Sequence, residues 1–216
     1  MRPVGKNPEA RRPAHQKELP SWIRVKKIVW GEKRHPRQEF FLPGIFLCVL
    51  SLEGGLVLIL GGVKSGKSTY ALALARKHSE PRAFLATAEP FDPEMKKRIE
   101  RHQESRGDGF ELFEEPLDIS GILPKLNHNV IVVDCLTVWL ANLYHHNQDI
   151  TKEEERLLDN LNGREIFVSN EIGWGVIPES TLARDYAERL AKLNQKLARR
   201  AKAVYLMVAG IAVKIK

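Results

Sequence analysis

The feature that most constrains this chain is the stretch GGVKSGKS, which fits the pattern G-x-x-x-x-G-K-[ST]. It comprises Gly61, Gly62, Val63, Lys64, Ser65, Gly66, Lys67 and Ser68. Glycines let successive backbone N–H groups curl around a phosphate, the lysine adds charge at the β- and γ-phosphates, and the Ser hydroxyl ligates Mg²⁺. The alternative is a Gly-rich turn without a nucleotide. An aliphatic run before the motif and strong helix formers after it favour a triphosphate-binding loop.

Downstream of this loop, short aliphatic runs alternate with amphipathic stretches, which is typical of βαβ units with a parallel sheet. We therefore predict the α/β fold class. The expected strands are Leu56–Leu60, Ala83–Thr87, Val130–Asp134, Glu165–Ser169 and Ala203–Ala209. The expected helices are Lys67–Lys77, Pro93–Ser105, Leu136–His145, Lys152–Leu161 and Thr181–Arg200.

The net charge of +7 is concentrated at the N-terminus. Residues 1–53 hold 11 Lys/Arg and 5 Asp/Glu, whereas residues 54–216 hold 23 and 22. The first segment also contains six prolines, so we expect a basic, poorly ordered extension at 1–53 and one domain at 54–216. The stretch from Trp22 to Trp30 is rich in apolar residues, so the alternative that part of the extension docks on the domain stays open. A further hypothesis is that the extension is not native, because translation starts near Leu52–Val57 at a non-ATG codon.

Composition also bears on partners and location. One alternative is a nucleic-acid-binding module that uses the basic extension. Because the charge of the domain is balanced, however, we expect no nucleic-acid partner. The longest uncharged apolar run, Phe40–Leu52, has 13 residues and contains Pro-Gly. It is shorter than the roughly 18 residues that a bilayer span needs. Two cysteines, Cys48 and Cys135, without a CxxC pair favour a reducing, cytoplasmic location.

A second element of a nucleotide site is the run Val130–Asp134, which ends in an acid. A carboxylate at the end of a buried strand is costly unless it is compensated, and Mg²⁺ would compensate it. The alternative is that Asp134 only caps the following helix. The two roles are compatible, and we predict Ser68 and Asp134 as the metal ligands.

A basic helix predicted from Pro93 carries one histidine. Its residues Met95, Ile99, His102 and Arg106 share one stripe by helical spacing. A neutral imidazole is a competent nucleophile toward phosphorus, and nearby cations stabilise the developing charge. By spacing alone, however, a lone histidine on a basic helix is more often simply solvated.

Several ordered motifs together resemble one family, the bifunctional adenosylcobinamide kinase / adenosylcobinamide-phosphate guanylyltransferases of cobalamin biosynthesis. The resemblance runs through nearly all of residues 56–216. Besides the phosphate loop, the matching stretches are Ala86-Thr87-Ala88-Glu89, Asp92-x-Glu94-Met95-x-x-Arg98-Ile99-x-x-His102-x-x-x-Arg106, Val133-Asp134-Cys135-Leu136-Thr137-x-x-Leu140-x-Asn142-Leu143 and Ser169-Asn170-Glu171-Ile172-Gly173-x-Gly175-x-Ile177-Pro178. The match closes with Asn194-Gln195 and the C-terminal run Val208–Lys216.

The resemblance implies a RecA-like P-loop domain, commonly a homo-oligomer such as a trimer, and two reactions. The first phosphorylates adenosylcobinamide with ATP or GTP. The second transfers GMP from GTP through a guanylyl-histidine, which gives adenosyl-GDP-cobinamide. His102 and Lys67 would be the catalytic residues. Family nucleotide contacts map, beyond the phosphate loop and Asp134, onto Thr87, Ala88, Glu89, Gln103, Glu104, Ser105, Arg106 and Glu114.

Two features depart from the family pattern. Residues 147–163 are shorter than the stretch that the family usually has between the helix after Asp134 and the next strand, and residues 1–53 match nothing in the family. Asn170 and Glu171 lie where ligands bind in open α/β sheets, and their motif fits either substrate contact or a turn that needs small residues.

A generic P-loop small-molecule kinase without guanylyl transfer remains the alternative enzyme.

Overall fold

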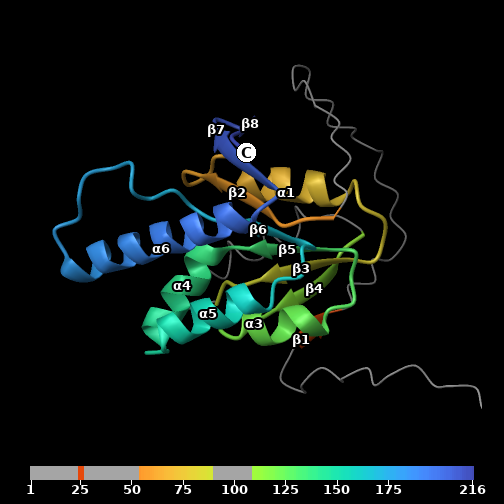
Figure 1. Cartoon of the computed structure of the whole chain (residues 1–216), viewed down its shortest axis with the longest axis horizontal. Helices are drawn as coiled ribbons and strands as arrows, with labels where there is room; N and C mark the ends of the chain where they lie inside the picture. The colour runs from red at the N-terminus through yellow and green to blue at the C-terminus, as the bar shows by residue number, and fades with distance from the viewer. Residues whose placement is uncertain (1–23, 27–53, 90–108) are drawn as a thin grey trace, which may run out of the picture.

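The computed structural model describes residues 24–26, 54–89 and 109–216, and an eight-stranded sheet runs through them (Figure 1). The strands are β1 (Arg24–Lys26), β2 (Val57–Gly61), β3 (Arg82–Ala86), β4 (Glu111–Glu114), β5 (Val130–Asp134), β6 (Glu165–Val168), β7 (Ala203–Val208) and β8 (Ile211–Lys214). Their order is β1-β4-β3-β5-β6-β2-β7-β8. The six inner strands pair in parallel, and the two edge strands pair antiparallel. The prediction of a mostly parallel α/β sheet is confirmed.

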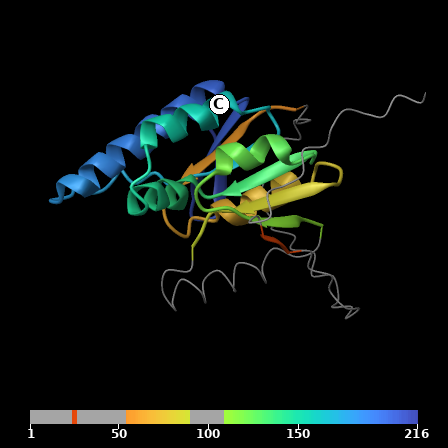
Figure 2. The same ribbon diagram turned by 90° about the horizontal axis from the view of Figure 1, so that it is seen from below.

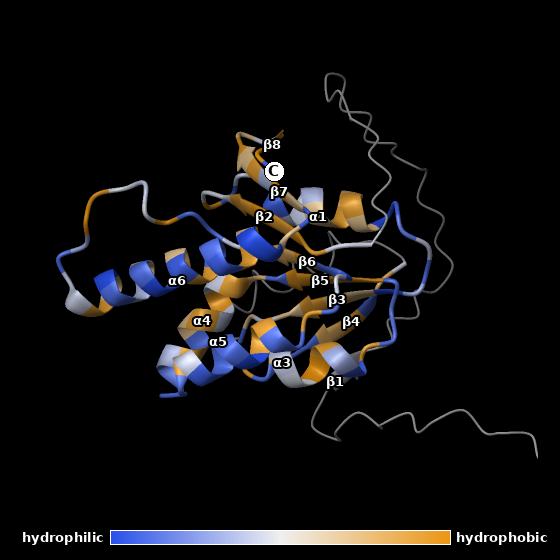
Figure 3. Cartoon of the chain, viewed as in Figure 1, coloured by the Kyte–Doolittle hydropathy of each residue, from blue (hydrophilic) through white to orange (hydrophobic). Residues whose placement is uncertain are grey.

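Helices cover both faces of this sheet. They are α1 (Lys67–Ala75), α3 (Ile119–Ile122), α4 (Leu136–His145), α5 (Ile150–Asp159) and α6 (Thr181–Arg200), and a 3₁₀ turn, η1 (Leu123–Lys125), follows α3. The buried residues of α1 pack on one face, and those of α3 to α6 pack on the other. Figure 3 shows the inner strands as a hydrophobic layer between these helices.

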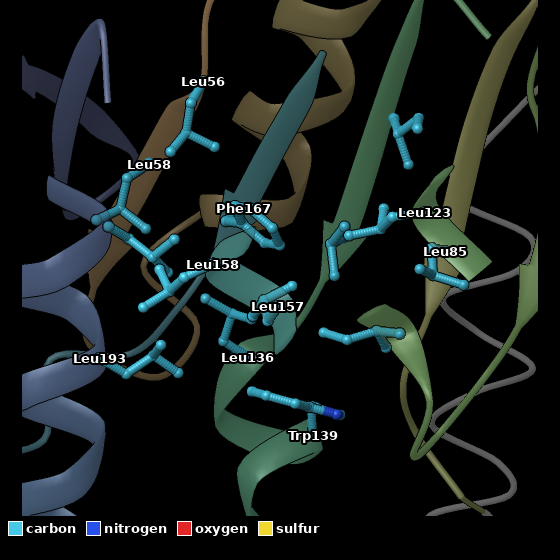
Figure 4. Close-up of a cluster of buried hydrophobic side chains, with 14 of the residues drawn as sticks. Leu56, Leu58, Leu85, Leu123, Leu136, Trp139, Leu157, Leu158, Phe167 and Leu193 are labelled. Carbon is cyan, nitrogen blue, oxygen red and sulfur yellow. The ribbon is translucent and has the colours of Figure 1, made fainter. Parts of the chain in front are cut away.

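The core follows from strand alternation. Along β2, Leu58 joins the cluster beneath α3 to α6, whereas Ile59 joins the cluster beneath α1. The larger cluster gathers Phe167 of β6, Trp139 of α4 and many leucines (Figure 4). Both aromatic side chains are fully buried, and the Trp139 indole N–H donates to the Leu117 carbonyl at 2.8 Å. Because both faces are covered, the inner strands are near-continuous aliphatic runs.

The stretch 147–163, which we expected to be shorter than in the family, forms α5 and packs on the core. Asp149 caps the start of α5 by accepting from the Lys152 N–H. Leu157 and Leu158 of α5 belong to the core, and α5 lies beside α6 (Figure 2). The buried Glu154 carboxylate accepts from Lys196 of α6 at 2.9 Å. These contacts hold α5 against the core and α6.

The predicted elements agree closely with those observed. The five predicted strands and four of the five helices occur within two residues of their expected bounds. The helix predicted at Pro93–Ser105 lies outside the described residues. Short or edge elements were not predicted: β1, β4, α3 and β8. The strand β1 shows that the backbone of three residues of the extension pairs with β4. Among the described helices, none is both long and apolar enough for a transmembrane span.

Candidate active site

The described residues that the sequence assigned to the nucleotide site lie at one edge of the sheet. Parallel strands bring their carboxyl ends together there: β2 ends at Gly61, β4 at Glu114 and β5 at Asp134. Ala86, the last residue of β3, pairs with both Glu114 and Asp134. In open α/β sheets ligands bind at this edge. The topology therefore joins residues that are far apart in the chain.

The phosphate loop has a backbone that only glycine allows at its two ends. Gly61 has φ +146°, and a Cβ there would lie 2.6 Å from the Met207 carbonyl oxygen. Gly66 has φ +96° immediately before α1. Between them the Ser65 N–H donates to the Gly62 carbonyl at 3.3 Å. Because these backbone conformations require glycine, the loop could be predicted from the sequence alone.

The turn between β7 and β8 braces the same loop, which the sequence did not indicate. The Gly210 N–H donates to the Ser65 carbonyl at 3.0 Å. A Cβ on Gly66 would come within 3.3 Å of the Gly210 Cα. The C-terminal hairpin is thus part of the wall of the site.

Lys67 opens α1 and is only 7% exposed. Its ammonium group donates to the Gly62 carbonyl at 2.6 Å, across the loop. The N-terminus of α1 adds the partial positive charge of its free backbone N–H groups. A buried ammonium beside these N–H groups is suited to a polyanionic ligand such as a triphosphate.

Asp134 and Lys67 both act electrostatically on Cys135, the residue that follows Asp134. Burial raises the pKa of the Cys135 thiol to about 11; the Asp134 charge adds to the rise and the Lys67 charge opposes it. Both charged groups are therefore within electrostatic range of the end of β5. In the described part of the chain, no hydrogen bond or ion pair of the Asp134 carboxylate is found. The Asp134 carboxylate and the Ser68 hydroxyl are hard oxygen donors of the kind that Mg²⁺ prefers, so the residues present fit this ion.

Thr87, just beyond β3, is fully buried. Its hydroxyl donates to the Cys135 carbonyl at 2.8 Å and accepts from the Cys135 N–H at 2.9 Å. On the other side, the Asn142 side chain donates to the Thr87 carbonyl at 2.7 Å. We predicted Thr87 as a nucleotide contact. In the structure its hydroxyl binds the backbone of Cys135, the residue after Asp134.

Replacing Thr87 with Val should lower the free energy of unfolding by about 2–3 kcal/mol, because two buried backbone groups of Cys135 lose their partner. Thr87→Ser keeps the hydroxyl and should cost less than about 1.5 kcal/mol. Urea denaturation of both variants measures the difference. Equal stabilities of the two variants would contradict a bridging role for the hydroxyl.

The remaining described candidates are Ala88, Glu89 and Glu114. Ala88 and Glu89 continue from β3 and are half-buried. The Glu89 carboxylate pairs with His146, at the end of α4, at 2.9 Å. No sequence pattern indicated this pair, since the two residues are 57 positions apart. His102, Gln103, Glu104, Ser105 and Arg106 lie outside the described residues.

A polar network on the β6 side of the loop was not predicted as a unit. The Thr137 hydroxyl accepts from the Asn170 N–H at 2.9 Å, and the Thr137 carbonyl accepts from the Tyr186 hydroxyl at 2.6 Å. The Asn194 side chain donates to the Asn170 carbonyl at 3.1 Å. These contacts tie the end of β6 to α4 and α6.

Comparison with known proteins adds a family match. Residues 57–215 match the family model described as cobinamide kinase / cobinamide phosphate guanyltransferase. Among individual proteins, the bifunctional adenosylcobalamin biosynthesis protein CobP of Pseudomonas aeruginosa is 39% identical over 166 residues, which cover 74% of this chain and 96% of the relative. The corresponding CobU protein of Escherichia coli is 32% identical over 181 residues, which cover 74% of this chain and 99% of the relative.

Among solved structures, the RadB recombinase aligns with a TM-score of 0.41 at 19% identity, over 71% of this chain and 74% of its own. The flagellar accessory protein FlaH of Methanocaldococcus jannaschii gives a TM-score of 0.40 at 15% identity, over 76% and 78%.

Proposed function

The chain belongs to the cobinamide kinase / cobinamide phosphate guanyltransferase family, and we propose that it catalyses both reactions on adenosylcobinamide. The first transfers the γ-phosphate of ATP or GTP to the aminopropanol hydroxyl of the corrinoid. The second transfers GMP from GTP to that new phosphate, which yields adenosyl-GDP-cobinamide and pyrophosphate. The observation that supports this most is the convergence of the phosphate loop, Lys67 and Asp134 at one sheet edge.

In the kinase reaction the protein mainly positions groups and neutralises charge. The backbone N–H groups of the loop and the ammonium of Lys67 bind the β- and γ-phosphates. Ser68 and Asp134 would hold Mg²⁺, which when bound offsets the negative charge of the triphosphate. The acceptor oxygen attacks the γ-phosphorus, the bond to the β-phosphate oxygen breaks, and the nucleoside diphosphate leaves.

In the guanylyl transfer we assign the nucleophile to His102. An imidazole nitrogen attacks the α-phosphorus of GTP, and pyrophosphate leaves from the phosphate loop. The resulting phosphoramidate is then attacked by a phosphate oxygen of the corrinoid, which releases the imidazole. Splitting the exchange into two displacements is the usual advantage of covalent catalysis. Further nucleotide contacts are assigned to Thr87, Ala88, Glu89, Gln103, Glu104, Ser105, Arg106 and Glu114.

Mass spectrometry of the intact protein after incubation with GTP and Mg²⁺ tests the assignment. We expect a mass increase of one GMP, with peptide mapping at neutral pH locating the adduct on His102. ATP in place of GTP is the matched control for base specificity. If the protein phosphorylates adenosylcobinamide but never carries GMP, the generic P-loop kinase is the correct description instead.

We also propose that the enzyme works in the cytoplasm as a homo-oligomer. Cys135 is a free thiol, which is compatible with a reducing compartment. Sedimentation velocity of the purified full chain measures its oligomeric state.

A further inference from the structure

The segment that leaves β6 has a particular place in the sheet. β6 pairs with β2, which ends at the phosphate loop, and with β5, which ends at Asp134. In P-loop enzymes the terminal phosphates lie between the loop and the strand-end aspartate that helps to hold Mg²⁺, here Asp134. The residues after Val168 therefore emerge where the γ-phosphate would be transferred, and an acceptor has to approach this point.

Glu171 is fixed in that position. Its N–H donates to the Gly61 carbonyl at 3.1 Å, next to the phosphate loop. One carboxylate oxygen accepts from the Asn194 side chain at 3.2 Å. Within the described residues, no hydrogen bond to the other carboxylate oxygen is found, and the side chain is half-buried. This oxygen is available to a substrate.

Two buried polar atoms beside Glu171 also lack partners. Ser169 is fully buried and Asn194 is 3% exposed. Within the described part of the chain, neither the Ser169 hydroxyl nor the Asn194 carbonyl oxygen has a hydrogen-bond partner. Buried polar atoms are normally paired, so a polar ligand group or water at this edge would complete the cluster.

The next residues form an exposed apolar loop. The exposed fractions are 72% for Trp174, 95% for Val176 and 79% for Ile177. Figure 3 shows apolar stretches in this loop, which projects from the sheet edge between β6 and α6. Several large apolar side chains exposed close together usually mark a contact surface. The loop continues directly from Glu171 and so adjoins the site of transfer.

We propose that Glu171 and the loop 172–177 form the acceptor subsite of the kinase reaction. This inference rests on the proposed function. Its occupant is the corrinoid, whose reacting hydroxyl sits on a short arm of a large, flat, methyl-bearing macrocycle. Trp174 and its apolar neighbours contact the macrocycle, and Glu171 accepts the proton of the hydroxyl. As that O–H bond breaks, its oxygen bonds to the γ-phosphorus and the nucleoside diphosphate leaves with the electrons of the broken P–O bond.

Two variants of the full chain test the two parts of the subsite with adenosylcobinamide, γ-labelled ATP and Mg²⁺. Glu171→Gln should lower kcat for phosphoryl transfer by about 10²-fold or more, with the KM for the corrinoid changed less than about threefold. Glu179→Gln makes the same replacement later in the connection to α6 and should leave kcat unchanged.

Trp174→Ala should raise the KM for the corrinoid by about 10-fold or more and leave kcat within about threefold, because it removes apolar contact with the bound macrocycle. Ile215→Ala, at an exposed apolar position near the C-terminus, is the matched control. GMP labelling of the protein without corrinoid should be unchanged in both variants, because that half-reaction needs no acceptor.

The outcomes separate this inference from the proposed function. Wild-type protein that neither phosphorylates the corrinoid nor takes up GMP would overturn both. Active wild-type protein together with a Glu171→Gln variant of normal kcat would overturn the acceptor role alone. If Trp174→Ala changes the sedimentation coefficient but not the KM for the corrinoid, the loop is a contact between copies of the chain, and the docking inference is wrong.

Discussion

Lys67→Ala is expected to reduce both phosphoryl transfer to adenosylcobinamide and GMP labelling of the protein by about 10³-fold or more. Lys67 is almost fully buried, and its ammonium lies within hydrogen-bond reach of the loop backbone at Gly62. A preorganised charge in a site of low dielectric stabilises the leaving phosphates without reorganisation in the transition state. Both reactions need this charge, because both expel a phosphate-bearing leaving group.

The matched control for this variant is Lys77→Ala. Lys77 is an exposed lysine two residues beyond the end of α1, and its removal should leave both rates within about twofold. Urea denaturation of the two variants separates lost catalysis from lost folding. If Lys67→Ala loses phosphoryl transfer but is labelled by GMP as fast as wild type, the guanylyl transfer uses another nucleotide site, and the proposal that both reactions use the phosphate loop is wrong.

The parts of the fold that could be predicted are those set by local physics. The phosphate loop is readable because Gly61 and Gly66 adopt positive φ angles. The inner strands are readable because burial on both faces demands aliphatic runs, as in Val130–Asp134, whose bounds were predicted correctly. The strand β4, with sequence ELFE, was not predicted because it has only two apolar residues, with a glutamate on each side.

The contacts that shape the site could not be predicted, because they join elements distant in sequence. Asn142 reaches Thr87 across 55 positions, and Asn194 reaches Glu171 across 23. The resemblance to the family includes both asparagines but gives them no partner, and by helical pattern alone a polar residue on a helix is most simply solvent-exposed. Only the sheet order, which places β6 between β2 and β5, brings these side chains to one edge.

His102→Ala is expected to abolish GMP labelling while phosphoryl transfer from ATP to adenosylcobinamide persists within about threefold. The reason is chemical. An alanine has no nitrogen with which to form the phosphoramidate, whereas the kinase reaction passes its phosphate directly to the acceptor without a covalent intermediate. The measurement is transfer of radioactivity from α-labelled GTP to the protein, run in parallel with the kinase assay.

The matched control for His102→Ala is His145→Ala. His145→Ala removes an exposed histidine at the end of α4 and should leave both activities unchanged, so it accounts for any general effect of losing an imidazole. If labelling persists in His102→Ala, the nucleophile is another residue and the assignment fails. If both activities disappear in a folded variant, His102 also serves the kinase step, and the division of labour between the imidazole and the Glu171 carboxylate proposed above has to be redrawn.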